Sequence, residues 1–397
     1  MADTQELLRD IAFDVKPSEG LAIFTICSNN YMPMAKVLMQ TARQHHPNAT
    51  LFLCLADKLL PDPEFYPPDC QVLVAEDLEI PEFPQFAFRY DVMEFNTALK
   101  PYMLLLLLKR GHDAIMYFDP DIEVFMPLDG IVSRLDDGAS FVLTPHLLQP
   151  AEDNCDPDDV GIMRAGIYNL GFLGVGATAE AQSVLEWWAR RLRYQCISDQ
   201  GAGLFVDQRF FDLVPGFVDH VQILRDPCYN VAYWNLGQRC LTKHGDRWRV
   251  DGRELGFFHF SGFDPTNRNR LSKHSTAFRG DDIPPPLLAI MRHYSDRVMA
   301  NGHRKARNIP YAYGNFASGV PISPEVRRMF RVQYEQWSGD PFTNFEDHVR
   351  TLDPAVPSMS AEELTRQVQA MHASTSWRIT RPLRAIKRLL QGERYSL

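Results

Sequence analysis

The sequence predicts an α/β fold in which helices connect the strands of a largely parallel sheet. Residues 21–26 form an apolar run of strand type, and residues 33–45 carry apolar side chains at helical spacing. Two more apolar runs follow, at residues 50–55 and 71–74. Strand–helix–strand order is typical of sheets with crossover helices. Because ligands in such folds bind at the carboxyl ends of strands, polar residues at those ends are the first candidates for a site.

Later segments continue the alternation of helices and strands. Pro101 near the start and Gly111 after the end predict a helix over residues 96–110. Glycines interrupt the strand pattern of residues 167–175, which indicates a bulge or a close approach of the backbone to a ligand. The remaining expected elements are strands at 114–118, 140–144 and 257–263, helices at 179–194 and 205–214, and a turn-rich acidic loop at 149–161, either a lid or a surface excursion.

Composition limits the possible functions. The chain has 397 residues, enough for one large domain with an appendage or for two domains, and its net charge of −9 argues against general nucleic-acid binding. The seven cysteines are scattered, so we expect reduced thiols, mostly in the core. The N-terminus is polar and acidic, without the pattern of a signal peptide, and the longest apolar run, 103–108, is too short to cross a bilayer. These features predict a cytoplasmic protein.

Two carboxylates close the strand expected at 114–118. Asp119 and Asp121 are two residues apart, so in an extended chain both side chains lean to one side, and Pro120 keeps Asp119 out of the helical region. Two hard oxygen ligands at a strand end suit a divalent cation that also holds phosphate. A solvated acidic turn is the alternative interpretation.

Other polar groups also lie where expected elements end. Tyr31 follows the first strand, and Asp207 with Gln208 opens the short helix expected at 205–214. His259 lies in a late apolar strand, either as a buried core histidine or as a metal ligand. The stretch that follows contains the cations Arg268, Arg270 and Lys273, either a solvated loop or a phosphate-binding cluster.

Four segments occur in an order that resembles the GT-A glycosyltransferases, most closely those of family 8. They are Asn30-Tyr31, Asp119-Pro120-Asp121, Tyr168-Asn169-Leu170-Gly171-Phe172 with Asp207-Gln208, and His259-Phe260-Ser261-Gly262. The resemblance covers residues 20–275. It implies a Rossmann-like GT-A fold, with a mixed sheet flanked by helices and a helical C-terminal extension.

The resemblance also implies roles for individual residues. Asp119, Asp121 and His259 would hold Mn²⁺ or Mg²⁺, which bridges the diphosphate of a nucleotide-sugar donor, a UDP-sugar being the first choice. Asp207 and Gln208 would lie beside the donor sugar as the catalytic pair. The further donor-binding residues implied are Asn30, Tyr31 (against the base), Lys100, Asn169 and Gly262.

The sequence departs from the family pattern after Gly262. The family turn continues to Lys-Pro-Trp, whereas Asp264-Pro265-Thr266 stands here, so the diphosphate lysine is missing. Arg268 or Arg270 are the substitutes that we predict.

The implied reaction is transfer of a sugar to a glycan, lipid-linked or protein acceptor, with retention favoured by the resemblance and inversion left open by the residues. A phosphohydrolase of the haloacid-dehalogenase type is an alternative, because it also carries Asp-x-Asp after an apolar strand. That class has Thr or Val where Glu123 stands, and carries the motif near the chain start. A second alternative is a non-catalytic carbohydrate- or partner-binding protein on a GT-A scaffold.

We predict four regions: a lead-in (1–19), the catalytic domain (20–275), a helical and loop-rich subdomain (276–350) and a basic tail (351–397). Within the tail, residues 374–391 combine cations with apolar residues that would share one helix face. This pattern indicates either peripheral contact with an anionic inner-membrane surface or a C-terminal helix that is docked or disordered. The tail is similar to one found on bacterial glycosyltransferases that build surface polysaccharides.

Overall fold

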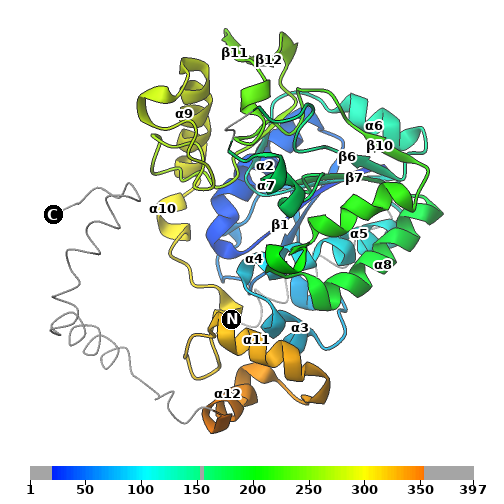
Figure 1. Cartoon of the computed structure of the whole chain (residues 1–397), viewed down its shortest axis with the longest axis vertical. Coiled ribbons are helices and arrows are strands. Elements are labelled where there is room, and N and C mark those ends of the chain that lie inside the picture. The colour runs from blue at the N-terminus through cyan, green and yellow to red at the C-terminus, as the bar shows by residue number, and fades with distance from the viewer. Residues whose placement is uncertain (1–19, 153–155, 353–397) are drawn as a thin grey trace, which may run out of the picture. The chain divides into compact units, whose positions relative to one another are not determined.

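The computed structural model describes residues 20–152 and 156–352 (Figure 1). By its internal contacts the chain divides into two units, Met1–Thr343 and Asn344–Leu397. The sheet and the candidate site described below belong to the first unit, and most of the last helix, Pro341–Leu352, belongs to the second. The predicted lead-in and the basic segment 374–391 lie outside the described residues.

A mixed seven-stranded sheet forms the centre of the first unit. Six of the seven strands run in the same direction, and β7 (Phe172–Gly176) runs antiparallel to its neighbours β4 (Ala114–Phe118) and β6 (Phe141–Leu143). The α/β class and the mixed sheet flanked by helices are therefore confirmed. The strand order is β10 (Val221–Ile223), β6 (Phe141–Leu143), β7 (Phe172–Gly176), β4 (Ala114–Phe118), β1 (Leu21–Cys27), β2 (Thr50–Leu55) and β3 (Gln71–Val74).

Helices and small sheets complete the architecture. The helices are α2 (Met32–His45), α3 (Phe83–Arg89), α4 (Val92–Ala98), α5 (Lys100–Lys109), α6 (Asp129–Asp136), α7 (Asp159–Ala165), α8 (Ala179–Gln195), α9 (Pro285–Ala300), α10 (His303–Ala306), α11 (Pro324–Gln333) and α12 (Pro341–Leu352). The small sheets pair β5 (Ile122–Val124) with β14 (Phe257–His259), β8 (Ser198–Asp199) with β9 (Leu204–Phe205), and β11 (Leu241–His244) with β12 (Arg247–Val250) and β13 (Arg253–Glu254).

Strand side chains alternate between two hydrophobic cores, one on each face of the sheet. Phe24 and Tyr117 join the core that contains side chains of α5 and α8, and their ring centroids are 5.0 Å apart. Ile23 and Met116 join the core on the α2 and α6 side. Complete burial of such a side chain stabilises the fold by about 1.5–3 kcal/mol. Burial on both faces explains why these strands are continuously apolar.

Strand β5 connects the acidic motif to the helical region beyond residue 276. It pairs antiparallel with β14, so that Ile122 lies opposite His259. The side chain of Glu123 is only 1% exposed, and its Oε1 accepts hydrogen bonds from Nε2 of His293, at 2.9 Å, and from the guanidinium of Arg297. Both partners belong to α9. A buried carboxylate requires such partners because burial of an unpaired charge is costly.

The boundaries of several elements differ from the prediction. Residues 96–110 contribute to two helices, because α4 ends at Ala98 and Pro101 suits the first turn of a new helix. The strand expected at 167–175 begins only at Phe172, because the preceding residues form the polar turn described below. The helix expected at 205–214 is β9 followed by the 3-10 helix η5 (Gln208–Gly216).

The described part of the chain contains six cysteines, all free, and Cys27, Cys54, Cys196 and Cys228 are buried. Burial raises the pKa of the Cys228 thiol to about 12, as expected of a packing residue rather than a nucleophile. Within residues 20–152 and 156–352, no helix combines the length and apolarity that crossing a membrane requires.

Candidate functional site

The acidic motif lies at the carboxyl end of β4, as predicted. Asp119 is two residues beyond Tyr117 and lies on the same side of the strand, which is the side of α5 and α8. The Tyr117 hydroxyl donates to Oδ1 of Asp119 at 2.5 Å. This contact fixes one carboxylate oxygen and leaves Oδ2 directed toward His259, 3.7 Å from its Nε2.

Asp119, Asp121 and His259 form a candidate metal site. One ligand atom from each residue lies within 4.8 Å of the other two. Nε2 of His259 is 3.1 Å from Oδ1 of Asp121, because the β5–β14 pairing holds the histidine beside the motif. Carboxylate oxygens suit Mg²⁺ and Mn²⁺, and imidazole is a common ligand of transition metals. The donor set therefore fits a divalent ion, with room left for oxygens from another molecule.

Burial lowers the pKa of His259, but the charge and hydrogen bond of Asp121 and the charge of Asp119 outweigh this effect and raise it above the ordinary value. The metal-free ring therefore tends to hold a second proton between the carboxylates. On its other side, Nδ1 lies 3.2 Å from Oδ1 of Asn169. A Cβ at Gly171 would lie 2.4 Å from the histidine ring, so only glycine fits there.

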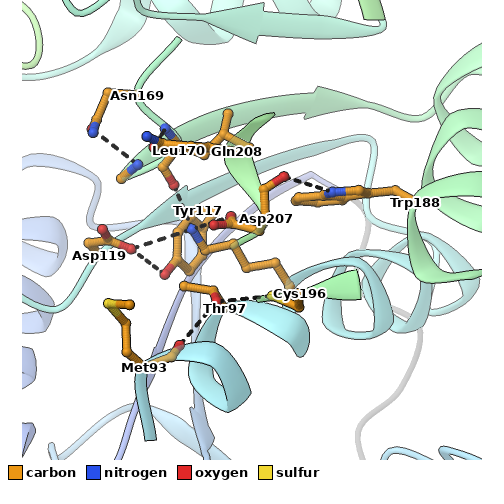
Figure 2. A network of polar contacts seen from close by, with 12 residues as sticks. Met93, Thr97, Tyr117, Asp119, Asn169, Leu170, Trp188, Cys196, Asp207 and Gln208 are labelled. Carbon is orange, nitrogen blue, oxygen red and sulfur yellow. Dashed lines mark hydrogen bonds and ion pairs between the residues drawn. The ribbon is translucent and has the colours of Figure 1, made fainter. Parts of the chain in front are cut away.

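Lys100 is buried beneath the acidic motif. Its ammonium lies 2.7 Å from Oδ2 of Asp207 and 3.6 Å from Oδ1 of Asp119, and it donates to the Leu170 carbonyl at 2.8 Å. Figure 2 shows Tyr117, Asp119 and Asp207 close to one another, with Leu170 nearby. Burial alone would lower the pKa of Lys100, but the charges of Asp207 and Asp119 raise it. The ammonium thus makes one hydrogen bond, to the Leu170 carbonyl, and two ion pairs, with Asp207 and Asp119.

The predicted catalytic pair is also buried. The side chain of Asp207 is 3% exposed; burial raises its pKa, and Lys100 opposes that shift. Gln208 Oε1 accepts from the Leu170 N–H at 3.3 Å, and Nε2 donates to the Ala165 carbonyl at 2.7 Å. In this structure the amide of Gln208 thus connects the turn at Leu170 to the end of α7.

A cleft of about 380 Å³ opens beside the predicted base-binding residues. Four of the residues predicted to bind the donor line this cleft together: Asn30, Tyr31, Gly262 and Arg270. Burial and the charges of Asp121 and Asp119 raise the pKa of Tyr31 to about 12, so the phenol stays protonated. Its ring is 40% exposed and free to stack.

Arg268 does not line this cleft. Its guanidinium bonds to the Ser295 hydroxyl at 2.9 Å and pairs with Asp296. The cleft instead contains Lys273, the third cation of the predicted cluster, and two basic residues that the prediction did not include, His303 and Arg307. The basic run at 303–307 was the only sequence feature that could have pointed to His303 and Arg307. Nothing in the sequence indicates that α10 packs beside the η1 segment (Asn29–Tyr31).

A buried polar network behind His259 was also not predicted. Oδ1 of Asn169 accepts from the Gly171 N–H at 3.1 Å and from Nδ2 of Asn230 at 3.0 Å, and Nδ2 of Asn169 lies 3.2 Å from Nε2 of His146. Asn230 also donates to the Thr144 hydroxyl at 2.8 Å. Thr144 and His146 directly follow β6, so their position at the carboxyl end of a strand was the available signal.

We expect His146 to make the protein sensitive to acid. Burial lowers the pKa of His146 to about 4, below the value of about 6.5 in an unfolded chain. The native state therefore binds fewer protons between these values, so stability is complete above pH 6.5 and falls as the pH drops toward 4, by an amount on the order of 3 kcal/mol.

The measurement is urea unfolding of the wild type and of His146→Gln from pH 7.5 to 4. The variant loses part of this pH dependence, whereas His244→Gln, on the exposed end of β11, retains it. Equal slopes for His146→Gln and the wild type would contradict the expectation.

No protein-family model matches the chain. Two proteins of Bacillus subtilis (strain 168) resemble about half of it. The uncharacterized protein YfnF is 26% identical over 194 residues, which cover 48% of this chain and 64% of YfnF. The uncharacterized protein YfnD is 27% identical over 194 residues, covering 47% and 59%. The chain thus matches less than two thirds of the length of either relative.

The chain is also similar to solved glycosyltransferase structures. The galactosyltransferase LgtC in complex with donor and acceptor sugar analogues has 11% identity and a TM-score of 0.40, covering 70% of this chain and 95% of LgtC. An active-site mutant of LgtC has 13% identity and a TM-score of 0.39. Mouse xyloside xylosyltransferase 1 has 13% identity and a TM-score of 0.36, covering 60% and 97%. These likenesses are too distant to assign a function.

Proposed function

We propose that this protein is a metal-dependent GT-A glycosyltransferase, of the family 8 type, that transfers a hexose from a nucleotide-diphosphate sugar to an acceptor. The observation that carries the proposal is the group of ligand atoms from Asp119, Asp121 and His259 near a cleft lined by Tyr31 and several cations. Two acidic oxygens and one imidazole nitrogen suit an ion that must also hold a diphosphate.

The three ligands would hold Mn²⁺ or Mg²⁺, which when bound supplies positive charge against the departing diphosphate. The cleft residues would hold the rest of the donor. Tyr31 would stack on the base, with Asn30 beside it, and UDP-sugars are the first donors to test. Lys273 and Arg307, from different segments of the cleft wall, would hold phosphate oxygens in place of the missing family lysine.

Lys273 is favoured for that role because its ammonium forms no ion pair with any residue in the described ranges. Two of the N–H groups of Arg270 already have partners, because its guanidinium donates to the carbonyls of Ser272 and Lys273 at 2.6 and 2.5 Å. It would shape the loop that carries Lys273. Arg268 pairs with Asp296, so it would affect the bound diphosphate only through the long-range effect of its charge.

Asp207 and Gln208 would define the floor of the donor-sugar site. The carboxylate of Asp207 pairs with Lys100, whose ammonium also lies 3.6 Å from Asp119, so Asp207 would act on the donor sugar through its charge. A negative group on that face favours an oxocarbenium-like centre. With no second carboxylate assigned as a general base, we favour retention, in which the acceptor proton passes to the leaving phosphate.

We further propose that the acceptor is a glycan or a lipid-linked or protein acceptor in bacterial surface polysaccharide synthesis, with residues 374–391 contacting the cytoplasmic side of an anionic membrane. This part of the proposal rests on the sequence pattern alone.

A thermal-shift panel of nucleotide sugars, each with and without Mn²⁺, tests the function. We expect one donor to stabilise the protein only with the metal, by about 2.7 kcal/mol at 100 times its dissociation constant. The corresponding nucleoside, which lacks the diphosphate, is the control and gives little shift. The proposal is wrong if no donor shifts the midpoint, or if the protein hydrolyses a generic phosphate ester instead.

A further inference from the structure

Asn169 contacts His259 from the side opposite the two carboxylates. Its Oδ1 also accepts from the Gly171 backbone N–H at 3.1 Å. A backbone N–H can only donate, so the atom facing it is the amide oxygen and not the nitrogen. The orientation of the Asn169 amide is therefore fixed independently of the histidine.

The orientation of Asn169 decides which ring nitrogen of His259 carries a proton. Nδ1 is 3.2 Å from an oxygen that can only accept, so Nδ1 must donate. The neutral ring that a metal ion would bind has one N–H, on Nδ1, so the lone pair of Nε2 would then be directed toward Asp119 and Asp121, whose nearest oxygens lie 3.7 and 3.1 Å away. This is the tautomer that a metal ligand needs, and the hydrogen bond of the other nitrogen selects it.

A contact with His146 holds the Asn169 amide in place. Nδ2 of Asn169 lies 3.2 Å from Nε2 of His146, and Nδ1 of His146 lies 3.4 Å from the Ile167 carbonyl. A neutral His146 with its proton on Nδ1 satisfies both contacts, because its Nε2 then accepts from the amide. Asn169 is 7% exposed, and its oxygen already accepts from Gly171, Asn230 and His259.

We propose that Asn169, backed by His146, is a positioning residue that fixes the tautomer and ring plane of His259 for metal binding, and is not itself a contact of the donor. The proposal rests on the metal site of the proposed function. It also accounts for Gly171: the turn brings the backbone so close to the ring that a Cβ would lie 2.7 Å from Nδ1.

The first test measures Mn²⁺ affinity of the full chain by electron paramagnetic resonance, without nucleotide or turnover. Asn169→Ala should weaken Mn²⁺ binding by about 10–100-fold. Asn169→Asp retains the acceptor for Nδ1 and should restore binding to within about threefold of the wild type. The matched control is Asn29→Ala, which removes another buried amide, 2% exposed, that bonds to Lys58 and Tyr66 and should leave Mn²⁺ affinity unchanged.

The second test needs no variant of Asn169. In the Co²⁺-loaded wild type, the ring N–H of a histidine bound through Nε2 gives a solvent-exchangeable, hyperfine-shifted proton signal, which His259→Gln should remove. The inference is overturned if the wild type lacks this signal, or if Asn169→Ala folds and binds Mn²⁺ like the wild type. If the wild type binds neither ion, the metal site of the proposed function fails as well, so the two failures are distinguishable.

Discussion

Asp121→Asn is expected to lower the rate of metal-dependent sugar transfer by about 10³-fold at saturating donor, equivalent to roughly 4 kcal/mol of transition-state stabilisation. The substitution keeps the shape of the side chain but removes the charge of the carboxylate nearest to Nε2 of His259, 3.1 Å away. The site then offers one anionic ligand instead of two. The measurement is initial-rate transfer with the donor identified by thermal shift, over a range of Mn²⁺ concentrations.

The control for this variant is Asp113→Asn. Asp113 precedes the other end of β4, where its carboxylate accepts from the Gly20 backbone N–H at 3.3 Å. The same chemical change there should leave transfer within about twofold of the wild type, as is usual for surface substitutions. Full metal-dependent activity in Asp121→Asn would remove this carboxylate from the metal site.

Lys100→Met is expected to destabilise the protein by about 3–5 kcal/mol, because it leaves Asp207 charged, buried and without its partner at 2.7 Å. Methionine retains most of the apolar stem of Lys100, whose ammonium lies 4.5 Å from the centroid of the Tyr117 ring. The loss therefore reports on charge more than on packing. The measurement is the free energy of unfolding from guanidinium denaturation.

The double variant Lys100→Met/Asp207→Asn separates stability from chemistry. With both charges removed, most of the lost stability should return, since replacing a whole buried pair costs far less than breaking it. Transfer should stay low, because the charge on the sugar face is absent. If Lys100→Met is as stable as the wild type, Asp207 is not a buried carboxylate that depends on Lys100.

The sequence was sufficient for several strands of the sheet, including the one that ends at the acidic motif. The predicted ranges at 50–55, 71–74 and 114–118 coincide with β2, β3 and β4, because each is a short apolar run that is bounded by turn residues. The position of Asp119 and Asp121 at the end of β4 follows from the same reasoning. The sequence was less informative about which residues lie next to the motif in space.

The pairing of β5 with β14 brings His259 to the acidic motif, and such a long-range pairing leaves no local pattern. Only the family resemblance suggested it. The polar network of Thr144, His146 and Asn230 depends on close packing between four segments. Such hydrogen bonds depend on three-dimensional fit, not on the periodicity or spacing of residue types.

The pairing of Glu123 with His293 and Arg297 has a consequence for how this chain can have evolved. The carboxylate lies two positions beyond Asp121, and both of its partners belong to α9. Replacement of the segment after residue 276 by an unrelated one would remove both partners at once. The buried carboxylate of Glu123 would then be left without a partner. The acidic strand and α9 therefore depend on each other for stability, and we expect that neither can be exchanged without the other.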